Sequence, residues 1–446
     1  MNAAAPPPGR GQALQRGLLE RLRGGAGSPI GGRAGWSLVV ELLQLASSTL
    51  VFLVLVQFMP QETFGELGAL LALAFPALSV ATLGSHYLLL RRSSQGGDLA
   101  DAWKRATTVG FVGPILAAGL MIALRPLLLP NVDPWAYALV FIGNLPFYWM
   151  NELAVYLGVG TGRMKQAAQA RFILVIWRFM ALGWFAIWGD GSLVAWASAS
   201  ALSFVASGFG ALLLVHRSYG LRPGFERTSF TDLPPGIPFS ANSVNESLVD
   251  SSDRWLLVRF GHLDDAALYT LGARVVQFGY LPLRTLLRAY DADLFGEGQY
   301  GVRATLAVTR RMIKPGMAIA VAVGFGFVVL APLIPVVAGP EYNDSVNVIR
   351  LLSVLPVIRM VQYLAGNILS ASDRQPWRMG ATGLAMVTNL GLNLWLLRDG
   401  TWRTAVFTTF VSEILLAGLL IGIVGFWVRR EDRDDQTPDA RRESAR

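Results

Sequence analysis

Charged and polar side chains recur at helical spacing inside the apolar runs of this 446-residue sequence. Between residues 238 and 260, Asn242, Glu246, Asp250 and Asp253 are separated by four, four and three positions, which places them on one face of a helix. The neighbouring stripe of that helix is also polar, and its residues are Ser243, Ser247, Ser251 and Arg254. We expect this polar side to line a water-filled cavity, with apolar residues on the opposite side.

Four arginines occupy positions near the middle of apolar runs: Arg178, Arg254, Arg274 and Arg359. A charge at that depth in a bilayer costs about 3 kcal/mol on insertion scales, so it normally faces protein or water. A guanidinium group can hold a phosphate, a pyrophosphate or a carboxylate with two hydrogen bonds, and it repels an organic cation. We therefore predict that these arginines bind an anionic substrate. Arg284, nearer the end of its run, is expected to reach the headgroups instead.

Four carboxylates at comparable depth are candidates for exchanging a proton or a sodium ion: Glu41, Glu246, Asp250 and Asp253. Glu41 and Glu246 are the first choices, because an internal offset of 204 residues brings them to nearly the same place in two halves of the chain. The alternative for any single residue is a structural ion pair between helices, such as Asp250 or Asp253 with Arg254 or Arg274.

The composition explains why charges at these positions are informative. Only 15% of the residues are charged and 53% are hydrophobic, whereas a soluble domain is close to one quarter charged. The net charge of +8 lies in short clusters between apolar runs, which indicates membrane topology and not nucleic-acid binding. The chain has no cysteine and three scattered histidines, so we expect no disulfide, metal site or cofactor.

Twelve runs are long and apolar enough to cross a bilayer, which requires roughly 20 residues. The seventh and eighth are the most polar. The predicted segments are 36–59, 64–90, 106–124, 135–159, 166–187, 193–215, 238–260, 267–287, 315–337, 346–371, 379–397 and 405–428.

The distribution of basic residues predicts the orientation of these segments. With the N-terminus in the cytoplasm, 27 of the 38 Lys and Arg fall in inner segments, and only Arg125, Arg398 and Arg403 fall in outer loops. Twelve helices with both termini cytoplasmic is therefore the predicted topology. The outer loops are short, so a soluble catalytic domain has no place there, and we do not expect an enzyme.

A Pro-rich break at 216–237 divides the chain into two sets of six segments. A faint repeat supports the division, since Leu67-Gly68-Ala69 recurs as Leu271-Gly272-Ala273. The sequence thus predicts an all-α membrane protein of two six-helix halves around a central cavity. The predicted divisions are a cytoplasmic tail at 1–35, halves at 36–215 and 238–428 with the linker 216–237 between them, and a charged tail at 429–446.

Several short motifs in this order resemble bacterial polysaccharide flippases over roughly residues 36–428. They are QETFG at 61–65, GIPF at 236–239, DSSDRWLL at 250–257, LDD at 263–265 and GPEY at 339–342. The resemblance is to the polysaccharide-transport branch, including O-antigen and exopolysaccharide flippases, of the multidrug/oligosaccharidyl-lipid/polysaccharide exporter superfamily. The YDADLF at 290–295 is more acidic than that family pattern.

The resemblance implies a MATE-like fold in the bacterial inner membrane, and translocation of undecaprenyl-diphosphate-linked oligosaccharide by ion-driven alternating access. The implied process is lipopolysaccharide or other surface-polysaccharide biosynthesis. The expected partners are the lipid-linked oligosaccharide, membrane lipids, and a polysaccharide polymerase and glycosyltransferases. Three alternatives remain: a drug/cation antiporter of the same fold, which the central arginines disfavour; a glycan polymerase or ligase, which the short outer loops disfavour; and a scaffold that binds glycan lipids without moving them.

Overall fold

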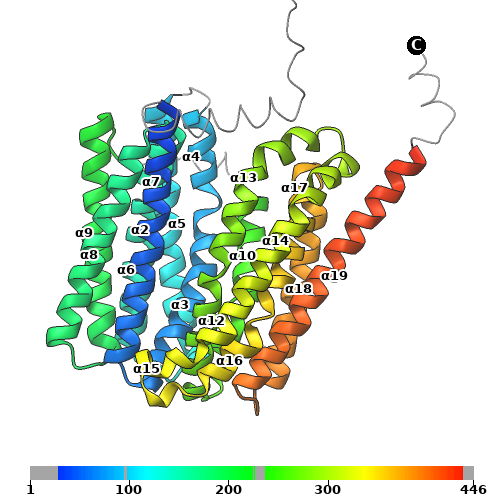
Figure 1. The fold of residues 1–446 in the computed structure, drawn as a ribbon. Coiled ribbons are helices and arrows are strands. Elements are labelled where there is room, and N and C mark those ends of the chain that lie inside the picture. The colour runs from blue at the N-terminus through cyan, green and yellow to red at the C-terminus, as the bar shows by residue number, and fades with distance from the viewer. Residues whose placement is uncertain (1–28, 95–97, 225, 227–236, 435–446) are drawn as a thin grey trace, which may run out of the picture.

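The structure is a computed structural model that describes residues 29–94, 98–224, 226 and 237–434. Within these ranges the regular elements are helices, with no strands. They form two groups that stand side by side, α2 to α9 and α10 to α19 (Figure 1). The predicted all-α fold of about twelve spans in two halves is confirmed.

The first half contains eight α-helices and one short π-helix among the described residues. Two predicted spans are each made of consecutive pieces here, α3 with α4, and α6 with the short π-helix η1 and α7. The bounds are α2 (Pro29–Phe58), α3 (Gln61–Thr82), α4 (Ser85–Ser94), α5 (Leu99–Leu128), α6 (Pro134–Gly143), η1 (Asn144–Tyr148), α7 (Trp149–Gly160), α8 (Met164–Trp188) and α9 (Leu193–Tyr219).

The second half is more broken. Its α-helices are α10 (Ile237–Val249), α11 (Ser252–Arg259), α12 (Leu263–Phe278), α13 (Tyr280–Gly298), α14 (Val302–Leu330), α15 (Ile334–Ala338), α16 (Ser345–Leu352), α17 (Leu355–Ala371), α18 (Gln375–Leu396) and α19 (Trp402–Asp434), and the 3₁₀ turns η4 (Ala331–Leu333) and η5 (Pro340–Tyr342) flank α15. Six helices in the described residues are long and apolar enough to span by themselves, and the α16–α17 region, bent by 42°, makes a seventh.

The seventh predicted segment, 238–260, is not one continuous helix. It is interrupted between α10 and α11, where Ser251 has the non-helical φ of −139°. The Ser251 hydroxyl donates to the carbonyl oxygens of Ser247 at 2.5 Å and of Ala72 in α3 at 3.0 Å. A serine that bonds preceding carbonyls in this way competes with the helix and bends it. The polar stripe is therefore split into two pieces, one before and one after Ser251.

The two halves meet where α3 packs on α12, toward the first turns of both helices. A Cβ on Gly65 would lie 2.5 Å from the Leu263 carbonyl oxygen, and a Cβ on Gly68 would lie 2.5 Å from the Thr270 hydroxyl oxygen. At position 65 only glycine permits the two backbones to approach this closely, and at position 68 the space of a side chain is taken by Thr270. On α12, Thr270 lies one helical turn before Arg274. The α3–α12 contact consequently forms one end of the space between the halves.

Candidate functional site

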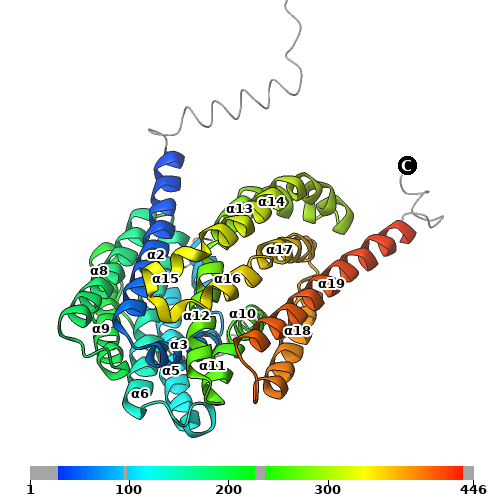
Figure 2. The ribbon, with the colours of Figure 1, turned by 60° about the horizontal axis from the view of Figure 1, so that its bottom comes forward.

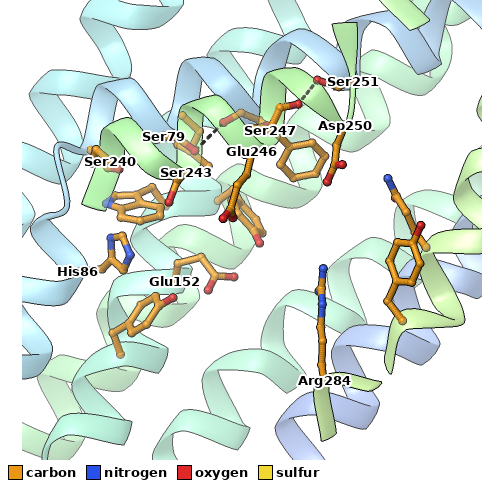
Figure 3. A pocket seen from close by; sticks show the side chains of 18 of the residues that line it. Ser79, His86, Glu152, Ser240, Ser243, Glu246, Ser247, Asp250, Ser251 and Arg284 are labelled. Carbon is orange, nitrogen blue, oxygen red and sulfur yellow. Dashed lines mark hydrogen bonds between the residues drawn. The ribbon is translucent and has the colours of Figure 1, made fainter. Parts of the chain in front are cut away.

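A cavity of about 560 Å³ lies between the two halves and is lined by both. The first half contributes an aromatic and acidic wall that includes His86, Trp149 and Glu152, and the second half contributes the serines of α10 (Figure 3). The charged residues that line it are Glu152, Glu246, Asp250, Arg254, Arg274 and Arg284. The predicted cavity therefore exists, and it includes four of the eight predicted site residues.

The deep arginines of the cavity lack acidic partners. Arg254 is 5% exposed and its Nη2 donates to the Asp250 carbonyl oxygen at 2.7 Å. The Arg274 guanidinium lies 5.8 Å from the centre of the Phe52 ring, with a long hydrogen bond of 3.4 Å to Gln277. Arg274 is also within electrostatic reach of both Arg254 and Arg178. Among the described side chains, no carboxylate lies within 4.0 Å of the guanidinium group of Arg254, Arg274 or Arg178, and Arg178 is not among the residues that line the cavity.

The interruption between α10 and α11 positions Arg254. In a continuous helix the carbonyl oxygen of Asp250 would accept from the backbone N–H of Arg254. Here that backbone N–H donates to the Asp253 side chain at 2.9 Å, and the Asp250 carbonyl accepts from the Arg254 guanidinium instead. A loop-like backbone at membrane depth is tolerated where it lines a cavity. The break thus fixes a cation at the cavity wall.

The carboxylates of the cavity are, in contrast, each paired with an arginine. Glu152 receives two hydrogen bonds from Arg171, at 2.5 and 3.1 Å, and both side chains are buried. The other two pairs are Arg378 with Glu246, at 3.1 Å, and Arg359 with Asp250. Arg359 also holds Glu413, so it serves two carboxylates. The unpaired Arg254, Arg274 and Arg284 still leave the described lining and its ion-pair partners with a net positive charge.

Arg359, predicted to bind substrate, does not line the large cavity. It donates to both Asp250 and Glu413, and so joins α17 to α19 and to the end of α10. Gln362 completes the cluster by donating to the Glu413 carboxylate at 2.6 Å. This cluster borders a second, small cavity of about 30 Å³, and Asp250 lines both cavities.

The remaining predicted carboxylates have separate environments. Asp253 is 1% exposed and accepts from the Thr409 hydroxyl at 3.2 Å, so it faces the small cavity and not the large one. Glu246 lines the large cavity and also accepts from Asn242 at 3.0 Å. The side chain of Glu41 lies outside the described residues.

Sequence reasoning missed several cavity residues. Arg284 was expected at the headgroups, yet it lines the cavity. Arg378, the partner of Glu246, lies in the first turn of α18. In the sequence, a basic residue between two apolar runs was interpreted only as evidence for a cytoplasmic loop. The aromatic wall was also missed, because the sequence search selected charged and polar residues. In the structure the Trp149 and His86 rings of this wall pack edge to face, with 4.9 Å between their centres.

A family model described as "Polysaccharide biosynthesis protein" matches residues 32–281, more than half of the chain. No curated protein matches the chain.

Solved structures of MATE transporters of the MOP superfamily share the fold at low identity. An inward-facing multidrug resistance transporter is 16% identical, with a TM-score of 0.67 over 87% of this chain and 96% of its own. An outward-facing form is 15% identical, with a TM-score of 0.59 over 91% and 98%. A Pyrococcus furiosus transporter, described as having a binding pocket of reverse polarity that suggests a different function, is 16% identical, with a TM-score of 0.57 over 90% and 96%.

Proposed function

Because this chain belongs to the polysaccharide biosynthesis protein family, we propose that it is a flippase for lipid-linked oligosaccharide. The proposed substrate is an undecaprenyl-diphosphate-linked oligosaccharide, moved across the bacterial inner membrane for surface-polysaccharide assembly. The polyprenyl tail stays in lipid while the diphosphate and sugars occupy the cavity between the halves. The polymerase and the glycosyltransferases that use the same lipid carrier are its proposed partners.

The observation that carries this proposal is the uncompensated positive charge of the cavity. Its three carboxylates are paired with Arg171, Arg378 and Arg359. Arg254 and Arg274 both line the cavity, within electrostatic reach of each other, and neither guanidinium group has a carboxylate partner among the described side chains. Two like charges in a poorly solvated site raise each other's energy, and a diphosphate between them would remove that cost.

The same charge balance distinguishes this proposal from a drug/cation antiporter of the same fold. An organic cation would need free carboxylates or an acidic wall in the cavity. The described carboxylates here are held by arginines, and a cation entering the cavity would meet Arg254, Arg274 and Arg284. The aromatic wall does not favour a cation over a sugar, because sugar rings stack on aromatic faces as organic cations do.

For the energy source we propose exchange of a proton or a sodium ion at the carboxylates near the α10–α11 break. Asp250 supports this because it borders both the large and the small cavity. An ion that binds at Asp250 would weaken its hold on Arg359 and change the charge that the substrate meets. Asp253 borders the small cavity, and Glu246 and Glu41 remain the other proposed sites. In the membrane, the proposed orientation has both termini in the cytoplasm.

The proposal is tested in a bacterium whose own copy of the gene has been deleted. Expressing the Arg254→Ala/Arg274→Ala variant should restore less than about one tenth of the surface polysaccharide that the unchanged protein restores. Arg403→Ala, at an exposed position in the first turn of α19, is the matched control and should restore it fully. Full export by a double variant that is present in the membrane at normal amounts would overturn the proposal.

A further inference from the structure

A second site candidate lies outside the cavity, on the membrane-facing side of α18 and α19. Figures 1 and 2 both show α19 at the edge of the molecule beside α18. An apolar groove of about 450 Å³ runs along this edge. Its lining residues are Trp377, Leu415, Gly418, Leu419, Gly422, Ile423 and Phe426.

Glycines form the floor of the groove. A Cβ on Gly418 or on Gly422 would meet nothing within 4 Å, so these positions are open and not packed against a neighbouring helix. From Leu415 to Phe426 the groove follows α19 over twelve residues, whose eleven helical steps span roughly 16 Å. That length matches one leaflet of a hydrocarbon core that is about 30 Å thick. The groove can therefore hold one extended acyl chain.

The groove ends at a cluster of aromatic rings and arginines. The Trp427 ring packs edge to face against both Trp377 and Phe426, at 6.0 and 5.6 Å between ring centres. Two guanidinium groups lie over that same indole, Arg374 at 3.6 Å and Arg430 at 5.1 Å. Tryptophan with arginine is the usual combination at the headgroup level of a membrane. The groove therefore runs from the hydrocarbon region to a cationic end.

The cationic end has no acidic partner among the described residues. Glu431 is occupied elsewhere, because it accepts the backbone N–H groups of Val302 and Arg303 at the start of α14. Asp432 pairs with Arg303 at 2.7 Å. The buried Nε of Arg374 has no hydrogen-bond partner. An anion at this place would complete the site.

We propose that this groove binds one anionic phospholipid of the surrounding bilayer. Its acyl chain would lie over Gly418 and Gly422, and its phosphate would contact Arg374 and Arg430. A second copy of the chain fits the groove less well. Two copies related by an axis along the membrane normal would bring the same arginines together, and these would repel one another.

The test uses purified full-length protein and native mass spectrometry, with phosphatidylglycerol and phosphatidylcholine of identical acyl chains. The unchanged protein should bind phosphatidylglycerol at least tenfold more tightly than phosphatidylcholine. Arg374→Gln/Arg430→Gln should abolish that preference, with Arg403→Gln as the matched control. Gly418→Leu/Gly422→Leu should fill the groove and remove the bound lipid, whereas Gly183→Leu on α8, another open helical glycine, should not.

Three results would overturn the proposal. Equal binding of the two lipids would remove the role of the arginines. Unchanged phosphatidylglycerol binding by the Gly418→Leu/Gly422→Leu variant would place the lipid elsewhere. A change from dimer to monomer in that variant, with lipid binding retained, would identify the groove as an interface between two copies.

Discussion

Gly68 of α3 packs directly on Thr270 of α12, and this contact joins the two halves at one end of the central cavity. A Cβ on Gly68 would lie 3.1 Å from the Thr270 Cβ, a few tenths of an ångström below the range of about 3.5–4.5 Å found in disulfides, so a small shift of the helices would allow the bond. Because alternating access requires the halves to separate here, the contact is a direct place to test the proposed transport cycle.

We predict that the Gly68→Cys/Thr270→Cys variant loses transport when it is oxidised and recovers when it is reduced. The natural chain contains no cysteine, so a bond formed in the variant is unambiguous. Mass spectrometry reports the bond, and surface polysaccharide reports transport. Thr270→Cys alone, which adds no side chain at Gly68, serves as the control that oxidant should leave unchanged. Normal transport by fully crosslinked protein would show that this contact does not open.

Gly65→Ala should destabilise the structure because the added methyl group would meet the Leu263 carbonyl oxygen. Overpacking of this kind costs about 1–3 kcal/mol. The measurement is the thermal unfolding of purified protein in detergent. Gly183→Ala, where the added methyl group meets nothing, should leave the unfolding temperature unchanged or raise it slightly. Equal behaviour of the two variants would contradict the close α3–α12 packing.

Glu152→Gln should destabilise the first half, because it leaves Arg171 buried without its carboxylate partner. Breaking a buried ion pair costs about 3–5 kcal/mol, whereas an exposed pair contributes at most about 1 kcal/mol. Asp432→Asn, which breaks an exposed pair with Arg303, is the control. Replacing both partners, as in Glu152→Gln/Arg171→Met, should recover much of the lost stability. A double variant less stable than Glu152→Gln would argue against the pairing.

Asp250→Asn should separate substrate binding from ion coupling. It removes a negative charge from the cavity wall and releases Arg359 from one of its two carboxylates. Affinity for an anionic lipid diphosphate should stay the same or rise, while stimulation of transport by an ion gradient should disappear. Binding and gradient-driven transport are measured on the same reconstituted protein, with Asp399→Asn as the control. Retained gradient stimulation would remove Asp250 from the coupling mechanism.

The fold was predictable from the sequence because its signals are long and repeated. Apolar runs, basic loops and the Pro-rich break each span many residues, and the twelve predicted segments overlap the observed helices. The interruption at Ser251 was not predictable, because it depends on a hydrogen bond to Ala72, 179 positions away in the chain. Periodicity assumes a continuous helix, so it placed Asp253 on the same face as Asp250.

The arginines also show that contacts between distant helices could not be predicted from the sequence. Arg254, Arg274 and Arg359 have similar depth and similar neighbours in the sequence, and all three were predicted to bind substrate. Only the packing of α17 against α19 shows that Arg359 holds Asp250 and Glu413, outside the lining of the large cavity. Charge in an apolar run therefore predicts a buried polar site, but pairing between distant helices decides which charges stay available to a ligand.

The most direct test of the flippase proposal measures translocation by the purified protein in vesicles. A fluorescent undecaprenyl-diphosphate disaccharide is incorporated, and a membrane-impermeant reductant quenches only the copies that reach the outer leaflet. The unchanged protein and Arg403→Gln should expose the protected copies, and Arg254→Gln/Arg274→Gln should do so at least tenfold more slowly. Arg254→Lys/Arg274→Lys, which keeps the charge but loses two-point binding, should be intermediate. Equal rates for the unchanged protein and a correctly folded glutamine double variant would contradict the account.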